Sequence, residues 1–357
     1  MNRELETGNR RVSGIERMAR EATALAEKRE VEYFSIEARS ILNRCSSDRM
    51  PFTWTINPYR GCEFGCHYCY ARYTHEYMGL NDPADFETRI YAKRDVARTL
   101  LRELTPERLR HQTIALGTAT DPYQPAERRF HVTRDLLEAL ARAEGVRLNI
   151  VTKSDLIVRD VDVLRRIAGR GSLQVSITLT TVDPRLARIL EFRAPTPQKR
   201  LAALRTLREG GIRAGVNIAP VLPDITDSRE NLATVIAAAK EAGATHVFAN
   251  TLFLRDLAKR RFFAFLEEHF PHLSARYALR YARSAFLDQR YKDQIMRLMD
   301  ELRREHGIPD RPDADPPAAA HEAAAEQLFL GFPEPPRLRL PSRQDRQEQP
   351  TSCFGRR

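Results

Sequence analysis

Residues 52–70 read FTWTINPYRGCEFGCHYCY, an apolar run with strand character followed at once by a loop that holds three cysteines. Cys62, Cys66 and Cys69 stand in C-x3-C-x2-C spacing, and the other two cysteines of the 357-residue chain are remote in sequence. Three thiols this close together do not make a convincing disulfide framework. The loop therefore predicts a metal site in a reducing compartment.

Downstream of this loop, short β-branched runs alternate with segments of helical periodicity. Strands are expected at residues 52–56, 113–117, 148–152, 174–179, 214–219 and 246–252. Helices are expected at 132–144, 160–168, 197–209 and 229–242, and then at 255–269 and 287–306. Repeated strand–helix–strand units predict a parallel sheet. Six units are fewer than the eight of a closed barrel, so an open, partial (β/α)6 barrel and a doubly wound sheet are the candidate α/β folds.

The flanking segments differ in composition from this core. Residues 1–50 mix charges with few apolar positions and predict a loosely attached leader before a core at 51–255. Residues 256–308 are expected to form a helical C-terminal extension. From 309 to 357 the chain is rich in Pro, Ala, Asp and Arg, which predicts a largely disordered tail because little apolar surface is available to bury.

The composition argues against a membrane protein and favours an anionic partner. No run approaches the roughly 20 apolar residues of a membrane span, and the charged N-terminal segment lacks the apolar region of a secretory signal. We therefore expect a cytoplasmic protein. The formal net charge of +10 favours nucleic acid as a partner.

Two kinds of metal site fit the cysteine spacing. Closed structural zinc needs four ligands, and His67 or His75 could complete a Cys3His set. However, His67 lies between two proposed ligands, and no second cysteine pair is present. A cubane iron–sulfur cluster ordinarily takes four thiolates, so three would leave one iron open, as in catalytic metal sites. Loops after parallel strands are also where α/β folds place their chemistry.

The C-x3-C-x2-C motif after a first barrel strand resembles the radical S-adenosylmethionine (SAM) superfamily. The resemblance implies a TIM-like partial barrel in which the three cysteines hold a 4Fe-4S cluster. The open iron would chelate the amino and carboxylate groups of SAM. Reduction, by a partner such as flavodoxin or ferredoxin, would then cleave SAM to a 5′-deoxyadenosyl radical that abstracts hydrogen from a substrate.

Three further segments narrow the resemblance. NPYRGC at 57–62, TDPYQP at 120–125 and TKS at 152–154 are similar to the branch that includes spore photoproduct lyase. This likeness implies a nucleic-acid substrate, with DNA favoured over RNA. The alternatives are radical modification of a peptide or small metabolite, and a non-enzymatic iron–sulfur or zinc protein that binds nucleic acid.

The resemblance also implies roles for individual residues around the cofactors. Tyr68 would lie against SAM, and Tyr70 matches a tyrosine of the lyase's radical relay. Each could instead be an aromatic residue packed beside the cluster. Lys153 and Ser176 fall where the lyase contacts SAM, although a lysine at a strand end could simply be solvated.

Two acidic residues and one arginine complete the predicted SAM site. Asp121 and Glu127 follow the second strand, where related enzymes bind the methionine amino group, although Asp121 could be a turn residue before Pro122. Arg200 could clamp the SAM carboxylate through two parallel hydrogen bonds. A local ion pair between Arg200 and Glu191 is the alternative.

The sequence departs from the lyase at its hydrogen-donor position. By the resemblance, the lyase has a cysteine there that quenches the product radical, and this chain has Thr118. A hydroxyl O–H bond is too strong to donate hydrogen readily. The lyase's own termination step is therefore not expected here.

A basic segment near the C-terminus predicts a phosphate-binding face. Arg276, Arg280 and Arg283 recur at intervals of three or four residues, so on a helix they would share one face, with Tyr277 and Tyr281 on its flank. A solvated helix face is the alternative.

Overall fold

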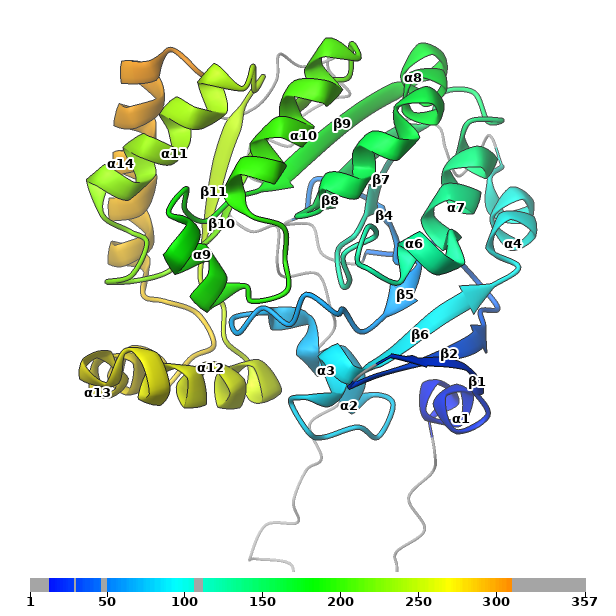
Figure 1. Cartoon of the computed structure of the whole chain (residues 1–357), viewed down its shortest axis with the longest axis horizontal. Helices are drawn as coiled ribbons and strands as arrows, with labels where there is room; N and C mark the ends of the chain where they lie inside the picture. Colours follow the sequence, from blue (N-terminus) through cyan, green and yellow to red (C-terminus); the bar gives the residue numbers. More distant parts are fainter. Residues whose placement is uncertain (1–12, 29, 46–49, 106–111, 310–357) are drawn as a thin grey trace, which may run out of the picture.

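Two β-sheets organise the computed structural model, which describes residues 13–28, 30–45, 50–105 and 112–309 (Figure 1). One is a seven-stranded sheet with the order β11-β10-β9-β8-β7-β4-β3, and the other is a four-stranded sheet with the order β1-β2-β6-β5. The predicted disordered tail, apart from Pro309, lies outside the described residues, and so does Cys353.

The larger sheet contains the six strands expected from the sequence. They are β4 (Trp54–Ile56), β7 (Thr113–Leu116), β8 (Arg147–Thr152), β9 (Ser172–Thr178), β10 (Ala214–Val221) and β11 (Val247–Thr251). Each pairs in parallel with the next, and β3 (Asn43–Arg44) adds an antiparallel edge. A doubly wound sheet reverses its strand order at a switch point. This sheet runs in chain order, so the fold is an open, partial (β/α)6 barrel.

Helices between the strands cover the outer face of the barrel (Figure 1). They are α4 (Val96–Glu103), α6 (Glu127–Phe130), α7 (Val132–Leu140), the 3-10 helix η2 (Asp155–Asp160), α8 (Val161–Arg170), α9 (Pro184–Leu190), α10 (Pro197–Glu209) and α11 (Arg229–Glu241). Local signals fix several starts: Thr196 caps α10 by accepting from Lys199 N, and Ser228 caps α11 by accepting from Asn231 N. The predicted helices at 132–144, 160–168, 197–209 and 229–242 are confirmed.

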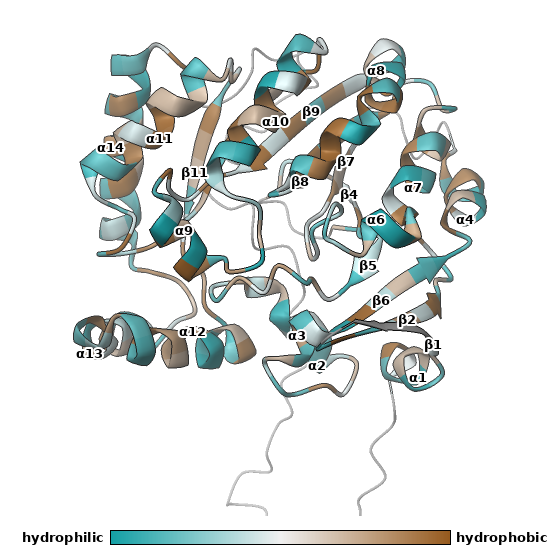
Figure 2. Cartoon of the chain, viewed as in Figure 1, coloured by the Kyte–Doolittle hydropathy of each residue, from teal (hydrophilic) through white to brown (hydrophobic). Residues whose placement is uncertain are grey.

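The two faces of β10 show how the barrel separates its core from its interior. Every residue of β10 is buried. Val216 and Ile218 belong to the main hydrophobic core, whereas Asn217 and Ala219 point the other way and line a pocket. Figure 2 shows apolar residues along the strands and mixed colours on the helices, as expected for amphipathic helices packed on buried parallel strands.

Three helices follow the last barrel strand, as the predicted C-terminal extension requires. They are α12 (Asp256–His269), α13 (Pro271–Arg280) and α14 (Gln289–His306). Helix α13 lies between the two helical stretches expected from the sequence. It is anchored by Tyr277, whose hydroxyl donates to Pro223 O at 2.6 Å.

The smaller sheet corrects the prediction of a loosely attached leader. Residues 14–37 form α1 (Gly14–Arg20), β1 (Thr23–Lys28) and β2 (Val31–Glu37), and β2 pairs in parallel with β6 (Arg89–Arg94). Val31 and Tyr33 are buried in the main core. Residues 31–37 are held in place because β2 pairs with β6, and β6 belongs to the long connection between β4 and β7.

That connection also carries the cysteine-rich stretch. It begins with β5 (Tyr59–Arg60), which pairs antiparallel with β6, and continues through the 3-10 helix η1 (Tyr70–Arg72), α2 (Tyr73–Glu76) and α3 (Asp85–Thr88). Within the part of the chain described here, no helix has both the length and the apolar character needed to cross a membrane.

Candidate active site

The cysteine loop, residues 61–70, leaves β5 through a tight turn that only glycine accommodates. Gly61 has φ +80°, and a Cβ atom there would lie 2.7 Å from the carbonyl oxygen of Arg89. Directly after it, Cys62 N donates to Phe86 O at 2.8 Å. The loop is therefore fixed against the connection that leads into β6.

A buried arginine fixes the other end of the loop. Arg72 donates to Cys66 O at 2.9 Å and forms an ion pair with Glu87. Its side chain is fully buried, and Arg261 reaches the same Glu87 carboxylate at 3.1 Å. The backbone between Cys66 and Arg72 is thus held by charged hydrogen bonds, which are the stronger kind.

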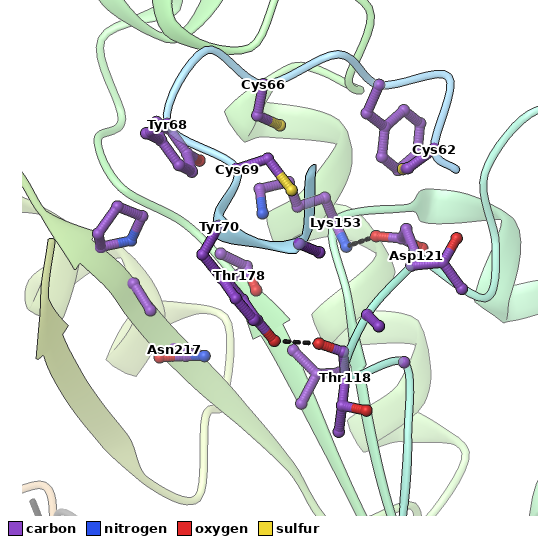
Figure 3. Close-up of a pocket in the computed structure, with 18 of the residues that line it drawn as sticks. Cys62, Cys66, Tyr68, Cys69, Tyr70, Thr118, Asp121, Lys153, Thr178 and Asn217 are labelled. Carbon is purple, nitrogen blue, oxygen red and sulfur yellow. Dashed lines mark hydrogen bonds between the residues drawn. The ribbon is translucent and has the colours of Figure 1, made fainter. Parts of the chain in front are cut away.

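Cys62, Cys66 and Cys69 line one pocket of about 130 Å³ at the C-terminal ends of the barrel strands (Figure 3). Residues in or directly after β7, β8, β9, β10 and β11 form most of the rest of its wall. This position confirms the expectation that the loop lies where parallel strands converge.

The three thiols have the chemistry that an iron–sulfur cluster requires. None is in a disulfide, and Cys62 and Cys66 are only 7% and 6% exposed. Burial raises the pKa of Cys66 to about 12 and also raises the pKa of Cys62 and of Cys69. Without a metal these groups are neutral thiols. Bound iron would convert them to thiolates and compensate for their burial, so the donor set fits a cluster.

The arrangement of the thiols disfavours a single zinc ion. Zinc ligands must meet within about 2.3 Å of one point. Across the described ranges, no group of three or more Cys, His, Asp or Glu side chains is placed to hold one ion. A cubane cluster takes its thiolates on separate irons, so its ligands need to face a shared cavity rather than one point.

The two histidines considered as a fourth zinc ligand do not line the pocket. The His67 ring stacks on Phe265 with 4.5 Å between centroids, and burial lowers its pKa to about 3. His75 Nε2 lies 3.1 Å from Arg89 O. Both rings belong to the packing around the loop.

Asp121 lines the pocket and joins two strand ends. Its carboxylate accepts from Thr152 Oγ1 and Lys153 N, both at 2.7 Å, and from Tyr123 N at 2.9 Å. The last bond is the turn contact that the sequence allowed before Pro122. Burial raises the pKa of Asp121 despite these donors.

Lys153 brings a positive charge to the cysteines. Its ammonium lies 5.6 Å from the centre of the Tyr68 ring, and both residues line the pocket (Figure 3). Burial lowers the pKa of Lys153, but the negative charge of Glu191, and that of Cys66 when it is a thiolate, outweigh burial, so its pKa is raised. The side chain is thus a cation placed for an anionic group.

Arg200 is engaged in the local ion pair that the sequence offered as an alternative. Its guanidinium pairs with Glu191 and donates to Thr178 O at 3.1 Å and to Pro195 O at 2.8 Å. Glu191 also accepts from the Tyr68 hydroxyl. Arg200 and Glu191 are each 1% exposed and neither lines the pocket. A direct contact between Arg200 and SAM stays a prediction.

Tyr70 crosses the pocket towards β7. Its hydroxyl donates to the backbone carbonyl of Thr118, as Figure 3 shows. Asn57 accepts from Ala119 N at 2.7 Å and donates to Thr118 Oγ1 at 3.1 Å. Tyr70 and Thr118, which the sequence singled out separately, are therefore direct neighbours.

Besides Arg200, two further predicted SAM-binding residues do not line the pocket. Glu127 is fully buried and accepts from Tyr59 Oη, Thr133 N and Arg159 Nη2 at 2.6–2.8 Å, so it fixes the start of α7. Ser176 is 5% exposed within β9, and the residue of that strand that lines the pocket is Thr178. Their contacts with SAM stay predictions.

Sequence reasoning missed the polar residues on the strands opposite the loop. Thr178 and Asn217 are paired in register on β9 and β10, and both line the pocket. The available signal was a polar residue inside the otherwise apolar run AGVNIAPV at 214–221.

The predicted arginine face is partly wrong. Helix α13 ends at Arg280, so Arg283 lies beyond it, and Tyr277 and Tyr281 are buried in the core instead of flanking an exposed face. Arg276 and Arg280 both pair with Asp224, at 3.0 and 2.7 Å. Phosphate binding by these arginines stays untested.

Relatives of this chain occur in bacteria, archaea and a virus. It is 38% identical to an uncharacterized protein of Mycobacterium tuberculosis over 266 residues, which cover 74% of this chain and 78% of the relative. It is 29% identical to an uncharacterized protein of Methanocaldococcus jannaschii over 275 residues, covering 74% and 92%. A protein of Acidianus two-tailed virus is 30% identical over 213 residues, covering 57% and 68%.

Solved structures share the fold. Spore photoproduct lyase complexed with dinucleoside spore photoproduct matches with a TM-score of 0.53 and 16% identity, covering 76% of this chain and 79% of the lyase. A variant of that lyase with bound AdoMet matches with a TM-score of 0.51 and 15% identity, covering 74% and 76%.

The family comparison agrees with the geometry of the cysteine loop. The model of the radical SAM superfamily matches residues 56–236, just over half of the chain. The protein therefore belongs to the radical SAM superfamily and is a radical SAM enzyme whose cofactors are a 4Fe-4S cluster and SAM.

Proposed function

We propose that Cys62, Cys66 and Cys69 hold the cluster and that the enzyme acts on nucleic acid, with DNA favoured over RNA. The observation that carries this proposal is that three thiols, two of them buried and that of Cys69 half-buried, line one pocket together with Lys153 and Asp121. When bound, the two cofactors supply a 5′-deoxyadenosyl radical that removes a hydrogen atom from the substrate.

The residues around the thiols are suited to orienting SAM. Lys153 offers its ammonium to the SAM carboxylate. An ionised carboxylate has about four acceptor sites, and Asp121 already uses three, so one remains for the SAM ammonium group. Tyr68 lies beside Lys153 and is held by Glu191, which Arg200 holds in turn. In this proposal Arg200 acts as a positioning residue for the Tyr68 ring.

Tyr70 is the proposed catalytic residue of the chain itself. It lines the pocket, and its hydroxyl is held by the Thr118 carbonyl. A phenol placed between the cysteine loop and the strand ends can pass a hydrogen atom to or from a substrate radical. This role fits the radical relay that the resemblance implies.

A nucleic-acid substrate is supported by the charge of the chain and by its fold. The formal net charge is +10, and a lyase of similar fold has been solved with a dinucleoside substrate. Radical modification of a peptide or small metabolite is the second candidate. We also propose a cytoplasmic location and a flavodoxin or ferredoxin as reductant, because the cysteines must stay reduced.

Anaerobic turnover tests this function. Reconstituted protein, dithionite and SAM should release 5′-deoxyadenosine slowly without substrate and faster with an oligonucleotide substrate. The rate of 5′-deoxyadenosine release with each oligonucleotide tested is compared with the rate with a peptide mixture at the same concentration. A reducible cluster whose spectrum SAM does not change, with no SAM cleavage, would overturn the enzyme assignment. Acceleration by peptides alone would overturn the nucleic-acid substrate.

A further inference from the structure

Asn217 presents an unpaired carboxamide to the pocket. The residue is 3% exposed, and its Oδ1 has no hydrogen-bond partner. It lies near the middle of β10, where Figure 3 shows it across the pocket from Cys66 and Cys69, with Tyr70 between them. A buried carbonyl without a donor is unfavourable, so its retention here points to a ligand that supplies one.

Asp121, Tyr70 and Thr118, which also line the pocket, differ from Asn217 because their polar groups already have partners. Asp121 accepts three hydrogen bonds, the Tyr70 hydroxyl donates to Thr118 O, and Thr118 Oγ1 accepts from Asn57. Thr178 lies beside Asn217 in register on β9 and adds a hydroxyl to the same wall. Asn217 is therefore available for a ligand, and Thr178 can support it.

Much of the remaining pocket wall is apolar. It includes Ala119, Val151, Ala219, Pro220, Leu252 and Phe253. Pockets of this kind bind the body of a ligand by apolar contact and orient it through a few polar groups.

The carboxamide favours one class of partner. It offers a donor and an acceptor side by side, so it pairs twice only with a group whose acceptor and donor are also adjacent. The edges of nucleobases have this arrangement. A single trans peptide unit directs its N–H and C=O to opposite sides, so it satisfies only one of the two groups, and an extended peptide would need two consecutive units to satisfy both.

We propose that Asn217 recognises a base of the substrate through the hydrogen-bonding edge of that base, with Thr178 beside it. This inference rests on the proposed nucleic-acid function and adds a specificity-determining residue to it. SAM also carries an adenine with such an edge, so the experiment must separate the two sources.

Binding of two oligonucleotides to the reconstituted full-length protein provides the test. One is a short single strand of mixed sequence with all four bases, and the other is an abasic strand of the same length, which keeps the phosphates. The variants are Asn217→Leu, which has a similar volume, and Asn217→Ala, which only removes atoms. Asn149→Leu is the matched control, because Asn149 is on neighbouring β8 and does not line the pocket. Cluster absorbance and thermal unfolding establish that each variant is folded.

The expected result is that both Asn217 variants bind the mixed strand about ten-fold more weakly, the value of one good bidentate base contact. Affinity for the abasic strand should be unchanged. Asn149→Leu should match the wild type in oligonucleotide affinity and in uncoupled SAM cleavage, because it does not alter the pocket.

Four results would overturn the proposal, and they have different meanings. Unchanged affinity in the Asn217 variants, or equal wild-type affinity for both strands, refutes base recognition by Asn217 and leaves the nucleic-acid function standing. Loss of SAM binding with intact oligonucleotide affinity assigns Asn217 to the adenine of SAM. Absence of wild-type binding to either strand at low salt refutes the nucleic-acid substrate together with this inference.

Discussion

The hydroxyl of Tyr70 donates a hydrogen bond to the backbone carbonyl of Thr118, which joins the cysteine loop to the end of β7. The two residues are 48 positions apart in sequence. Their contact brings the phenol of Tyr70, one residue after Cys69, against Thr118. By resemblance, the related lyase has its hydrogen donor at the position of Thr118. If hydrogen transfer involves the protein, Tyr70 is a pocket-lining group that could take part.

Tyr70→Phe should separate SAM cleavage from substrate turnover. The ring and its packing remain, so the cluster and uncoupled 5′-deoxyadenosine release should be retained. Substrate-dependent turnover should fall by about ten-fold or more, equivalent to about 1.4 kcal/mol or more of barrier, because the hydroxyl that would pass the hydrogen atom is absent. The measurement is the ratio of product to 5′-deoxyadenosine. Tyr91→Phe, on the small sheet, is the control, and an unchanged ratio in Tyr70→Phe would refute a relay role.

Cys→Ala substitution at Cys62, Cys66 or Cys69 should abolish the cluster. In the proposed site each thiolate binds one iron of the cluster and the fourth iron stays open. With only two thiolates, a second iron would lose its protein ligand. Iron and sulfide analysis after anaerobic reconstitution measures this outcome. Cys45→Ala is the control, since Cys45 does not line the pocket. Stoichiometric zinc in the wild type, without competence for iron, would contradict the prediction.

The Glu191–Arg200 ion pair should make a large contribution to stability. Arg200→Met leaves a buried carboxylate without its main partner, and such losses cost about 3–5 kcal/mol. Glu191→Gln in the same chain should restore much of that stability. Urea unfolding of the two single variants and the double variant measures the coupling. Additive effects would show that the pair is not a unit.

The same pair predicts a dependence of stability on acid pH. Burial, the largest single influence, raises the pKa of Glu191, but Arg200, Lys153 and the hydrogen bonds from Arg200 and Tyr68 together outweigh it, so the folded-state pKa is lowered from 4.5. The pair's contribution is therefore fully present above about pH 4.5 and is lost as pH falls through the lower folded-state value. The wild type should lose more unfolding free energy than the double variant between neutral pH and pH values below about 4. Parallel losses would contradict this sign.

Local periodicity explains why the barrel could be predicted from the sequence. Each strand from β7 to β11 and the helices α7, α8, α10 and α11 carry their own apolar pattern, and consecutive elements are neighbours in space. The smaller sheet was missed because β2 and β6 pair across more than fifty residues and β5 has only two residues. No local pattern encodes such a pairing.

The candidate site was predictable only where it is contiguous. The three cysteines fall within eight residues, so their spacing alone indicates shared ligation. Thr178 and Asn217 meet through the register of β9 and β10, and Tyr70 meets Thr118 through the path of a long connection. Glu127 was predicted to bind SAM because it follows β7. In the structure its carboxylate accepts a hydrogen bond from Thr133 N at the start of α7, a contact between segments that the sequence did not indicate.

Thr118 predicts that the enzyme will not repair spore photoproduct. The position offers a hydroxyl, whose O–H bond is too strong to quench a product radical, and its Oγ1 is already bonded to Asn57. Thr118→Cys alone should not install repair, because the substrate contacts would also have to match. Incubation with a thymine-dimer oligonucleotide and chromatography of the products measures this. Efficient repair by the wild type would contradict it.

The arginines of α13 predict how oligonucleotide binding depends on salt. Asp224 pairs with both Arg276 and Arg280, whose side chains are 57% and 25% exposed, so it neutralises part of their charge while leaving them accessible. Asp224→Asn should release that charge, and it fits the backbone because Asp224 has φ +59°, a conformation that asparagine tolerates.

If these arginines bind phosphates, Asp224→Asn should strengthen binding and steepen the slope of log affinity against log salt by roughly −0.7 for each further phosphate neutralised on a single strand. Replacing Arg276, Arg280 and Arg283 with Ala should flatten the slope by a similar amount for each phosphate that is no longer neutralised. Uncoupled SAM cleavage should stay unchanged in both variants, because neither alters the pocket. Fluorescence anisotropy between 50 and 200 mM salt, roughly the range over which phosphate binding dominates, gives the slopes. Identical slopes in the wild type and both variants would exclude these arginines from phosphate binding. The proposed contact of Asn217 with a base would then be the remaining place to look for substrate binding.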